Sequence, residues 1–332
     1  MRPRTFGRRT CAALVGAAVC GSALAQQPSA ASGRDFPNRP IRIIVPFSAG
    51  SGPDVLSRMM GQKFYEAWGQ PTIVDNRTGA AGIIATELVA KASPDGYTLL
   101  MSSPSQVITV ALYPKLPYDF LRDITPVTLI AGSHYLLAIN NQIAARSLRE
   151  LVALAKAKPE HLSYGSAGTG TLPHLAGEQF KQQAGLNITH VPYKGAPQVI
   201  NDVMGGQISM MFNSVATLSP FVKTGKLRGI AIAAPARTPV LPDLPTFAEE
   251  GMTGFEVRVW FGLLTTAGAP PATIGKLNAE VVRVLNTPDM RDRLNGLGLE
   301  VVGSTPQAFG ELLRQDIALY ARLIKSAKIR LE

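Results

Sequence analysis

The fold class is decided by two stretches with the same pattern: Val45-Pro46-Phe47-Ser48-Ala49-Gly50-Ser51-Gly52-Pro53-Asp54, and Tyr164-Gly165-Ser166-Ala167-Gly168-Thr169-Gly170-Thr171-Leu172-Pro173-His174. In each, a short strand pattern ends in a turn of glycine and hydroxyl residues, and a helix pattern then begins with a proline in its first turn. A helix N-terminus carries about half a positive charge and leaves backbone N–H groups without partners. We therefore predict two anion-binding turns that face each other across a cleft.

Strand and helix patterns alternate on both sides of these turns. Strands are predicted at 41–45, 72–74, 97–101, 136–139, 162–164, 188–192 and 208–212, and helices at 54–68, 82–92, 148–157, 173–184 and 197–204. Such alternation predicts an α/β fold with mostly parallel sheets and helices on their faces. The C-terminal quarter is more helical, and one apolar face there is predicted to pack in the core: Phe309, Leu313, Ile317, Tyr320 and Ile324.

Residues 1–25 have the pattern of a cleaved signal peptide. Four arginines precede an apolar segment, and Ala23-Leu24-Ala25 forms the small-x-small cleavage site. We expect export to the periplasm, cleavage after Ala25 and a flexible mature N-terminus over 26–33; the choice between the general and the twin-arginine route stays open. Both cysteines, Cys11 and Cys20, would leave with the peptide, which excludes disulfides, and the formal net charge would fall from +10 to +6.

The 332 residues, 46% of them hydrophobic, predict about two packed domains. The chain has no zinc-binding His-Glu-x-x-His motif, no phosphate loop and no block of basic residues for nucleic acid. We therefore expect no cofactor, no metal and no nucleic-acid partner. An enzymatic alternative remains: an exported serine hydrolase that uses Ser166 with His174 or His190, which would need a third group to orient the histidine.

The mature chain resembles the Bug proteins, the extracytoplasmic solute receptors of tripartite tricarboxylate transporters. The resemblance rests on these segments: 36–54, Val74-Asp75-Asn76-Arg77, Pro94-Asp95-Gly96-Tyr97, Leu112-Tyr113-Pro114-Lys115-Leu116-Pro117-Tyr118-Asp119, 164–178, Val191-Pro192-Tyr193-Lys194-Gly195, Leu241-Pro242-Asp243-Leu244-Pro245-Thr246 and Trp260-Phe261-Gly262-Leu263.

The resemblance implies a two-domain periplasmic binding protein of type II, which closes like a Venus flytrap on its ligand. One discontinuous domain would span 34–132 and 260–332, the other 133–259, with chain crossovers near 130–134 and 259–264. The ligand would be a small carboxylate, delivered to the membrane subunits of a transporter by a monomeric receptor that is not an enzyme. A receptor that reports to a signalling partner is the alternative, because the docking surface cannot be read from the sequence.

The family's carboxylate site lies between the two glycine-rich turns. The resemblance therefore nominates Phe47, Ser48, Ala49, Gly50, Ser51, Asp54, Ser166, Gly168, Thr169, Gly170 and His174. We add Ser102 and Ser105 at the variable end of the pocket, Lys194 after a strand, and Asn213. Ser51 stands where the family usually has glycine, and Asn213 where it usually has aspartate. Loss of that negative charge predicts greater tolerance of an acidic ligand group.

Overall fold

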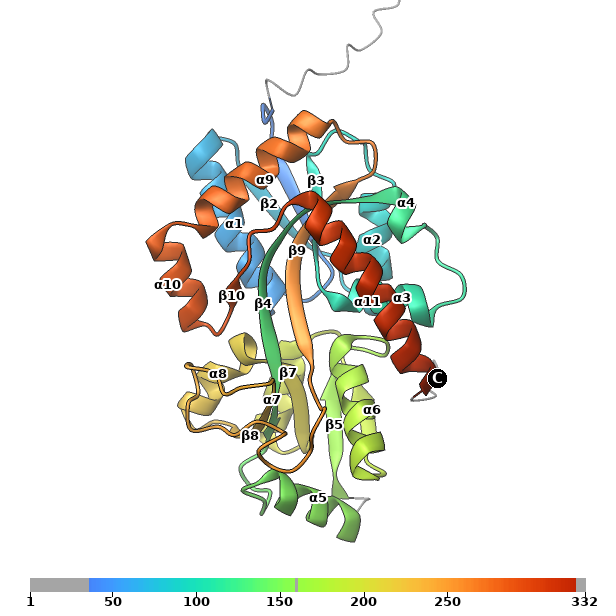
Figure 1. Cartoon of the computed structure of the whole chain (residues 1–332), viewed down its shortest axis with the longest axis vertical. Helices are drawn as coiled ribbons and strands as arrows, with labels where there is room; N and C mark the ends of the chain where they lie inside the picture. The colour runs from blue at the N-terminus through green and yellow to red at the C-terminus, as the bar shows by residue number, and fades with distance from the viewer. Residues whose placement is uncertain (1–35, 159–160, 327–332) are drawn as a thin grey trace, which may run out of the picture. The chain divides into compact units, whose positions relative to one another are not determined.

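Two long strands organise the structure, β4 (Ile124–Ile139) and β9 (Arg258–Thr266). In this computed structural model, which describes residues 36–158 and 161–326, the two run antiparallel and side by side (Figure 1). β4 pairs with β9 up to His134 and with β7 (Met210–Ser214) and β8 (Arg228–Ala233) from Tyr135 onward. β4 therefore passes through two sheet regions. The predicted signal peptide, 1–25, and the segment 26–33 lie outside the described residues.

We call the region built on β9 and residues 124–134 of β4 the first half. Three of its strands are parallel to one another: β1 (Ile41–Val45) lies between β2 (Thr72–Asn76) and β3 (Thr98–Ser102). β3 then pairs antiparallel with β9. The short β10 (Glu300–Val301) pairs with β4. The helices of this half are α1 (Gly52–Trp68), α2 (Ile83–Ala90) after a 3₁₀ turn at Ala80–Gly82, α3 (Pro104–Leu112), α4 (Phe120–Asp123), α9 (Pro271–Leu285), α10 (Pro288–Gly296) and α11 (Pro306–Ser326).

We call the region built on β7, β8 and residues 135–139 of β4 the second half. β5 (Ser163–Ser166) lies parallel between β6 (Thr189–Pro192) and β7. Its helices are α5 (Leu148–Ala157), α6 (Leu172–Ala184), α7 (Ala196–Gly205) and α8 (Val215–Lys223). The strand order β2-β1-β3-β9-β4-β7-β5-β6 confirms the α/β class. The domain bounds 34–132, 260–332 and 133–259 stay a prediction.

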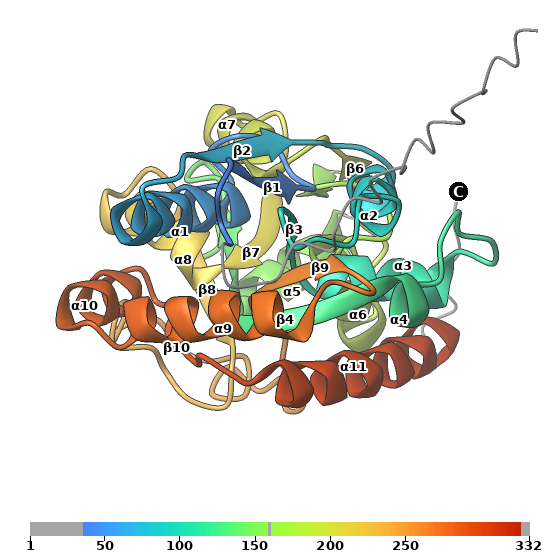
Figure 2. The same ribbon diagram turned by 90° about the horizontal axis from the view of Figure 1, so that it is seen from above.

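Burial of their side chains explains why the apolar runs of the sequence form strands. Four of the five side chains of β1 are completely buried, as helices cover both faces of a parallel sheet. On α11, Phe309, Leu313, Tyr320 and Ile324 are buried, which confirms the predicted core face. Figure 2 shows α9, α10 and α11 along one side of β4 and β9.

The sequence analysis located most elements within a few residues but missed several. The predicted strand 136–139 is only the end of the sixteen-residue β4. The sequence analysis assigned no element to α3, α8, β8, β9, α9 or α10. β9 is nearly all buried, so it has no alternation of apolar and polar residues from which a strand could be recognised.

Close packing at the centre of β9 gives a first prediction. A Cβ atom on Gly262 would lie 2.4 Å from a ring carbon of the buried Phe309 and 3.0 Å from the carbonyl oxygen of Thr128. Gly262→Ala should lower the free energy of unfolding by about 1–3 kcal/mol through overpacking. Urea unfolding measures this change.

The matched control is Gly275→Ala in α9, where a new Cβ has nothing within 4 Å. That variant should be as stable as the parent or more stable by up to about 1 kcal/mol, because alanine favours helix. Equal stability of the two variants would contradict the packing argument.

Candidate functional site

Five strand-to-helix junctions meet at one cavity between the two halves. They are β1–α1, β3–α3, β5–α6, β6–α7 and β7–α8, and each helix starts within a few residues of the carboxyl end of its strand. The cavity has a volume of about 40 Å³, enough for about three water molecules. Its walls are Phe47, Ser51, Gly52, Pro53, Ser103, Ser105, Tyr135, Ala167, Pro173, Ala196, Asn213, Ser214, Thr217, Val259 and Phe261.

This central cavity offers hydrogen-bond donors. The backbone N–H groups of Gly52 and Ala167, one from each glycine-rich turn, have no hydrogen-bond partner among the described residues. The buried hydroxyl of Ser51 is also unpartnered there. Asn213 accepts the N–H of Ser214 with its Oδ1, and within the described chain its side-chain NH₂ has no acceptor. A ligand with an electronegative group would accept hydrogen bonds from these unpartnered donors.

The electrostatics of the central cavity also favour an anion, although no cationic side chain is among its described wall residues. No Lys, Arg, Asp or Glu is among the residues that line the central cavity. The N-terminal, positive ends of five helices, α1, α3, α6, α7 and α8, contribute to its walls instead. An anion bound there would interact with amides and hydroxyls, as at other helix N-termini.

Asp54 holds the first turn in shape. Its carboxylate is buried and accepts hydrogen bonds from the N–H of Gly50 (2.9 Å), from Arg58 (2.9 and 3.1 Å) and from Asn76 (3.0 Å). Asn76 also donates to the carbonyl oxygen of Phe47. Burial raises the pKa of Asp54, but the hydrogen bonds from Arg58, Gly50 and Asn76 outweigh it and leave the pKa below its usual value. Asp54 therefore orients the turn, and it is not among the residues that line the central cavity.

The second turn satisfies most of its own amides. Gly168 N–H donates to Ser166 Oγ (3.1 Å), Gly170 N–H to His174 Nδ1 (3.2 Å) and Thr171 N–H to the Gly168 carbonyl. The N–H of Leu172, at the start of α6, donates to Ser105 Oγ (3.2 Å), which joins the two halves. These groups shape the turn, and Ala167 is the residue that reaches the central cavity.

Ser166 and His190 form the contact that a serine hydrolase would need, yet the rest of such a centre is lacking. Ser166 Oγ lies 2.7 Å from His190 Nε2, but the serine is only 1% exposed. In the described part of the chain no carboxylate is hydrogen-bonded to His190. Burial and the neighbouring His174 lower the pKa of His190 to about 4. The pair therefore lacks the third, orienting group of a catalytic triad.

The nominated residues fall into three groups. Phe47, Ser51, Ser105 and Asn213 line the central cavity. Asp54, Ser166, Gly168, Gly170 and His174 take part in the hydrogen bonds within the turns. The remainder do not line the central cavity: Ser48, Ala49, Ser102, Thr169, Lys194 and Gly50, the last of which donates its N–H to Asp54 and lines the adjoining apolar cavity. Their contact with a ligand stays a prediction.

Ser48 and Gly50 mark a contact between the halves. A Cβ atom on Gly195 would lie 1.9 Å from Ser48 Oγ, and one on Gly50 would lie 3.8 Å from Pro197. The first turn is therefore packed against the start of α7. This contact covers one side of the central cavity.

Asn213 was predicted, but Ser214 and Thr217 were missed at the β7–α8 junction. This junction has no glycine-rich turn, because Ser214 ends the strand and is at once the N-cap of α8, accepting the N–H of Thr217. A serine directly before a helix pattern was the available signal. Ser103, the N-cap of α3, lies in the same hydroxyl-rich segment as the nominated Ser102 and Ser105 but was not itself nominated.

An apolar cavity of about 290 Å³ adjoins the central one and shares Gly52 and Thr217 with it. It lies between α1 of the first half and α7 and α8 of the second. Its walls contain no charged residue, and most are aliphatic or aromatic: Val55, Leu56, Met59, Pro197, Ile200, Ala216, Pro220, Phe221, Leu297 and Leu299. Among the described residues, no group of acidic, histidine or cysteine side chains could hold a metal ion.

A cavity between two α/β halves that share crossover strands, with helix N-termini directed into it, defines a two-domain solute-binding protein. Residues 56–329 match the family model described as the tripartite tricarboxylate transporter family receptor. The chain belongs to this receptor family, which confirms the resemblance to Bug proteins. In the part of the chain that the structure describes, none of the helices has the length and apolar character that a membrane span requires.

Individual relatives agree over nearly the whole chain. Protein BugT of Bordetella pertussis is 31% identical over 322 residues, which cover 96% of this chain and 98% of BugT. A Rhodopseudomonas palustris protein solved with adipate has a TM-score of 0.86 and 33% identity, covering 89% of this chain and 99% of that one. MatC from the same organism, solved with bound malate, has a TM-score of 0.83 and 32% identity, covering 87% and 100%.

The Asp54 network gives a second prediction. Asp54→Asn removes the charge that pairs with Arg58 and places an amide near the N–H of Gly50, so it should lower the free energy of unfolding by about 1–3 kcal/mol at pH 7. Because the folded pKa lies below the usual value, this stabilisation is present above about pH 4 and is lost as the pH falls further. Urea unfolding at pH 7 and pH 3 tests both statements.

The control for Asp54 is Asp243→Asn, at an exposed aspartate without a hydrogen bond to any described residue. It should match the parent at both pH values. An Asp54→Asn protein as stable as this control would overturn the role of Asp54.

His190 gives a third prediction, on pH. Its folded pKa of about 4 lies below the unfolded value of about 6.5, so the unfolded chain takes up a proton first as the pH falls. The protein should lose up to about 3 kcal/mol of stability between pH 6.5 and pH 4 through this residue. His190→Gln should show a smaller loss over that range, while His161→Gln, at an exposed histidine, should behave as the parent does. Identical pH profiles for all three proteins would contradict the assignment.

Proposed function

We propose that this chain is a periplasmic receptor that holds a small organic carboxylate in the central cavity and delivers it to the membrane subunits of a tripartite tricarboxylate transporter. One observation carries the proposal. Five helix N-termini and several unpartnered donors, from both halves, converge on one cavity whose described wall residues include no charged side chain. Relatives solved with adipate and with malate support the same ligand class.

The carboxylate group would lie among the N–H groups of Gly52 and Ala167, the Ser51 hydroxyl and the Asn213 amide. The central cavity has room for such a group but for little more. The body of the ligand would extend past Gly52 and Thr217 into the adjoining apolar cavity. Apart from Asn201 and Thr217, the walls there would offer a second carboxylate only apolar contacts, so acids with an apolar chain or ring are favoured.

Binding would bridge the two halves and stabilise their contact at Ser48 and Gly195. Ligand entry requires that contact to open, and β4 and β9 are the strands about which the halves would rotate. Ser166 and His190 would have no catalytic role, because the receptor would release its ligand chemically unchanged. The receptor would act as a monomer.

The test is isothermal titration of protein that has been unfolded and refolded to remove bound ligand. Hexanoate and benzoate should bind at least tenfold more tightly than hexanamide, which lacks the charge, and more tightly than citrate. NMR of the mixtures after long incubation should show no loss of ligand. Equal affinity for hexanoate and hexanamide would overturn the carboxylate site, and turnover abolished by Ser166→Ala would support the hydrolase instead.

Asn213→Asp gives a fourth prediction. The substitution keeps the acceptor for Ser214 N–H but replaces the NH₂ donor with a negative charge beside the proposed carboxylate. Hexanoate affinity should fall at least tenfold. Asn295→Asp, an exposed position in α10, should leave the affinity unchanged. Unchanged binding by the Asn213 variant would refute the placement of the carboxylate.

A further inference from the structure

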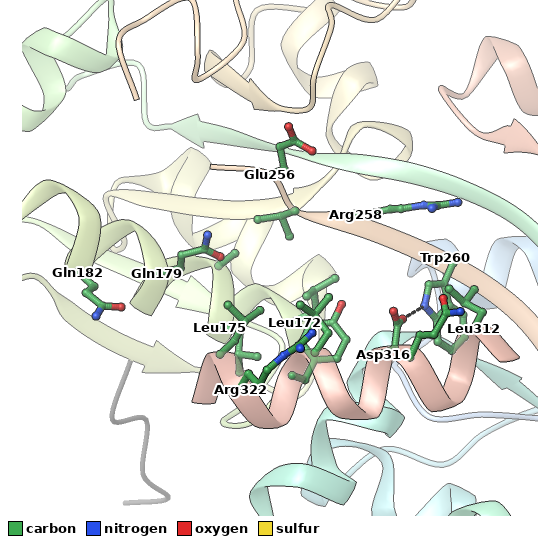
Figure 3. Close-up of a pocket in the computed structure, with 16 residues that line it drawn as sticks. Leu172, Leu175, Gln179, Gln182, Glu256, Arg258, Trp260, Leu312, Asp316 and Arg322 are labelled. Atoms are coloured by element: carbon green, nitrogen blue, oxygen red, sulfur yellow. Dashed lines mark hydrogen bonds between the residues drawn. The ribbon is translucent and has the colours of Figure 1, made fainter. Parts of the chain in front are cut away.

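A groove of about 500 Å³ lies on the far side of β9 from the central cavity. Side chains of a strand point alternately to its two faces. On β9, Val259 and Phe261 line the central cavity, whereas Arg258 and Trp260 line this groove. We call it the rear groove, and Figure 3 shows it between α6 of the second half and α11 of the first. Nothing in the proposed function uses it.

The floor of the rear groove has a fixed carboxylate. Trp260, 1% exposed, donates its indole N–H to Asp316 Oδ2 at 2.6 Å (Figure 3). Asp316 Oδ1 accepts no hydrogen bond from any described residue. Burial raises the pKa of Asp316, because the surroundings disfavour its charge. A donor or cation from a ligand would therefore be stabilised at Oδ1.

Tyr320 adds a second polar group one helical turn further along α11. Its side chain is only 7% exposed, and its hydroxyl makes no hydrogen bond with the described residues. Burial and the nearby Asp316 raise its pKa, so the hydroxyl stays protonated. A bound ligand in this groove would supply the Tyr320 hydroxyl with a hydrogen-bond partner.

The rim of the rear groove carries three exposed charges: Glu256, Arg258 and Arg322. None of the three forms an ion pair with another described residue. Together with Asp316 they give two negative and two positive charges around one space. The apolar part of the wall comes from Leu172, Leu175 and Leu319, with Leu319 being 40% exposed.

We propose that the rear groove is a second binding site, for an α-amino acid with an apolar side chain. The ammonium group would bind Asp316 Oδ1 and the Tyr320 hydroxyl. The carboxylate would bind Arg258 or Arg322, and the side chain would pack on Leu172 and Leu175. A simple anion would face Asp316 without compensation, and a simple cation would leave both arginines unpaired. The zwitterion is the small ligand that matches both signs of charge.

The test uses the fact that the chain has two tryptophans, Trp68 and Trp260. In a Trp68→Phe background the single indole N–H resonance belongs to Trp260, at the floor of the groove. Titration with L-leucine should shift this resonance and give a dissociation constant. N-acetyl-leucine, which lacks the ammonium, and leucine amide, which lacks the carboxylate, should each bind at least tenfold more weakly.

Variants locate the site. Asp316→Asn keeps an acceptor for Trp260, and Tyr320→Phe removes only the hydroxyl; both should weaken leucine at least tenfold while hexanoate binding persists. Asp292→Asn, an exposed aspartate in α10, and Ser51→Val in the central cavity should leave leucine binding unchanged. Loss of leucine binding in Ser51→Val alone, or no binding at millimolar leucine, would overturn the proposal. Neither result would bear on the hexanoate experiment, which tests the proposed function separately.

Discussion

The hydrogen-bonded pairing of β4 with β9 is the constraint on which the rest of the structure depends. It runs from Ile124 opposite Thr266 to His134 opposite Arg258, and β4 then continues into the second sheet region at Tyr135. Everything at the centre of the molecule is positioned by these strands. The central cavity lies on one face of β9 and the rear groove on the other. Tyr135 of β4 lines the first space and its hydroxyl helps to raise the pKa of Tyr320 in the second.

The two spaces differ in how they treat charge. The central cavity presents helix dipoles, amides and hydroxyls, and its walls contain no formal charge. The rear groove presents side-chain charges of both signs around the partly buried carboxylate of Asp316. Fixed dipoles need no reorganisation when an anion binds, so the central cavity suits carboxylates that carry either an alkyl chain or a ring. Paired charges instead demand a ligand with its own charges at matched positions.

Local pattern accounts for what the sequence predicted well. The glycine-rich turns, the prolines that start α1 and α6, and the apolar face of α11 are all encoded within about ten residues, so their elements were found. β9 and the long β4 were not, because strands buried along their length lack a period. The domain crossovers came from the family resemblance and not from any periodicity.

The part of the site that could be predicted is the part encoded by short, contiguous sequence patterns. Phe47, Ser51, Ser105 and Asn213 line the central cavity, and they sit on or beside strand ends that the sequence marks. Ser214 and Thr217 were missed because their junction has no glycine-rich turn. Gly168 and Gly170 donate their backbone N–H groups to Ser166 and His174. These hydrogen bonds depend on side-chain geometry, which the spacing of residues in the sequence does not reveal.

The position of β9 in the sheet also has a consequence for how the chain folds. β9 separates β3 from β4 in space, but in sequence it begins more than 100 residues after either of them ends. An N-terminal fragment ending before residue 258 therefore has β1, β2 and β3 without the strand that joins them to β4. Contacts between residues so far apart in sequence require a large loop to close before they can stabilise the chain. This loss of conformational entropy slows folding. The first half can reach its native topology only after nearly the whole polypeptide has been synthesised.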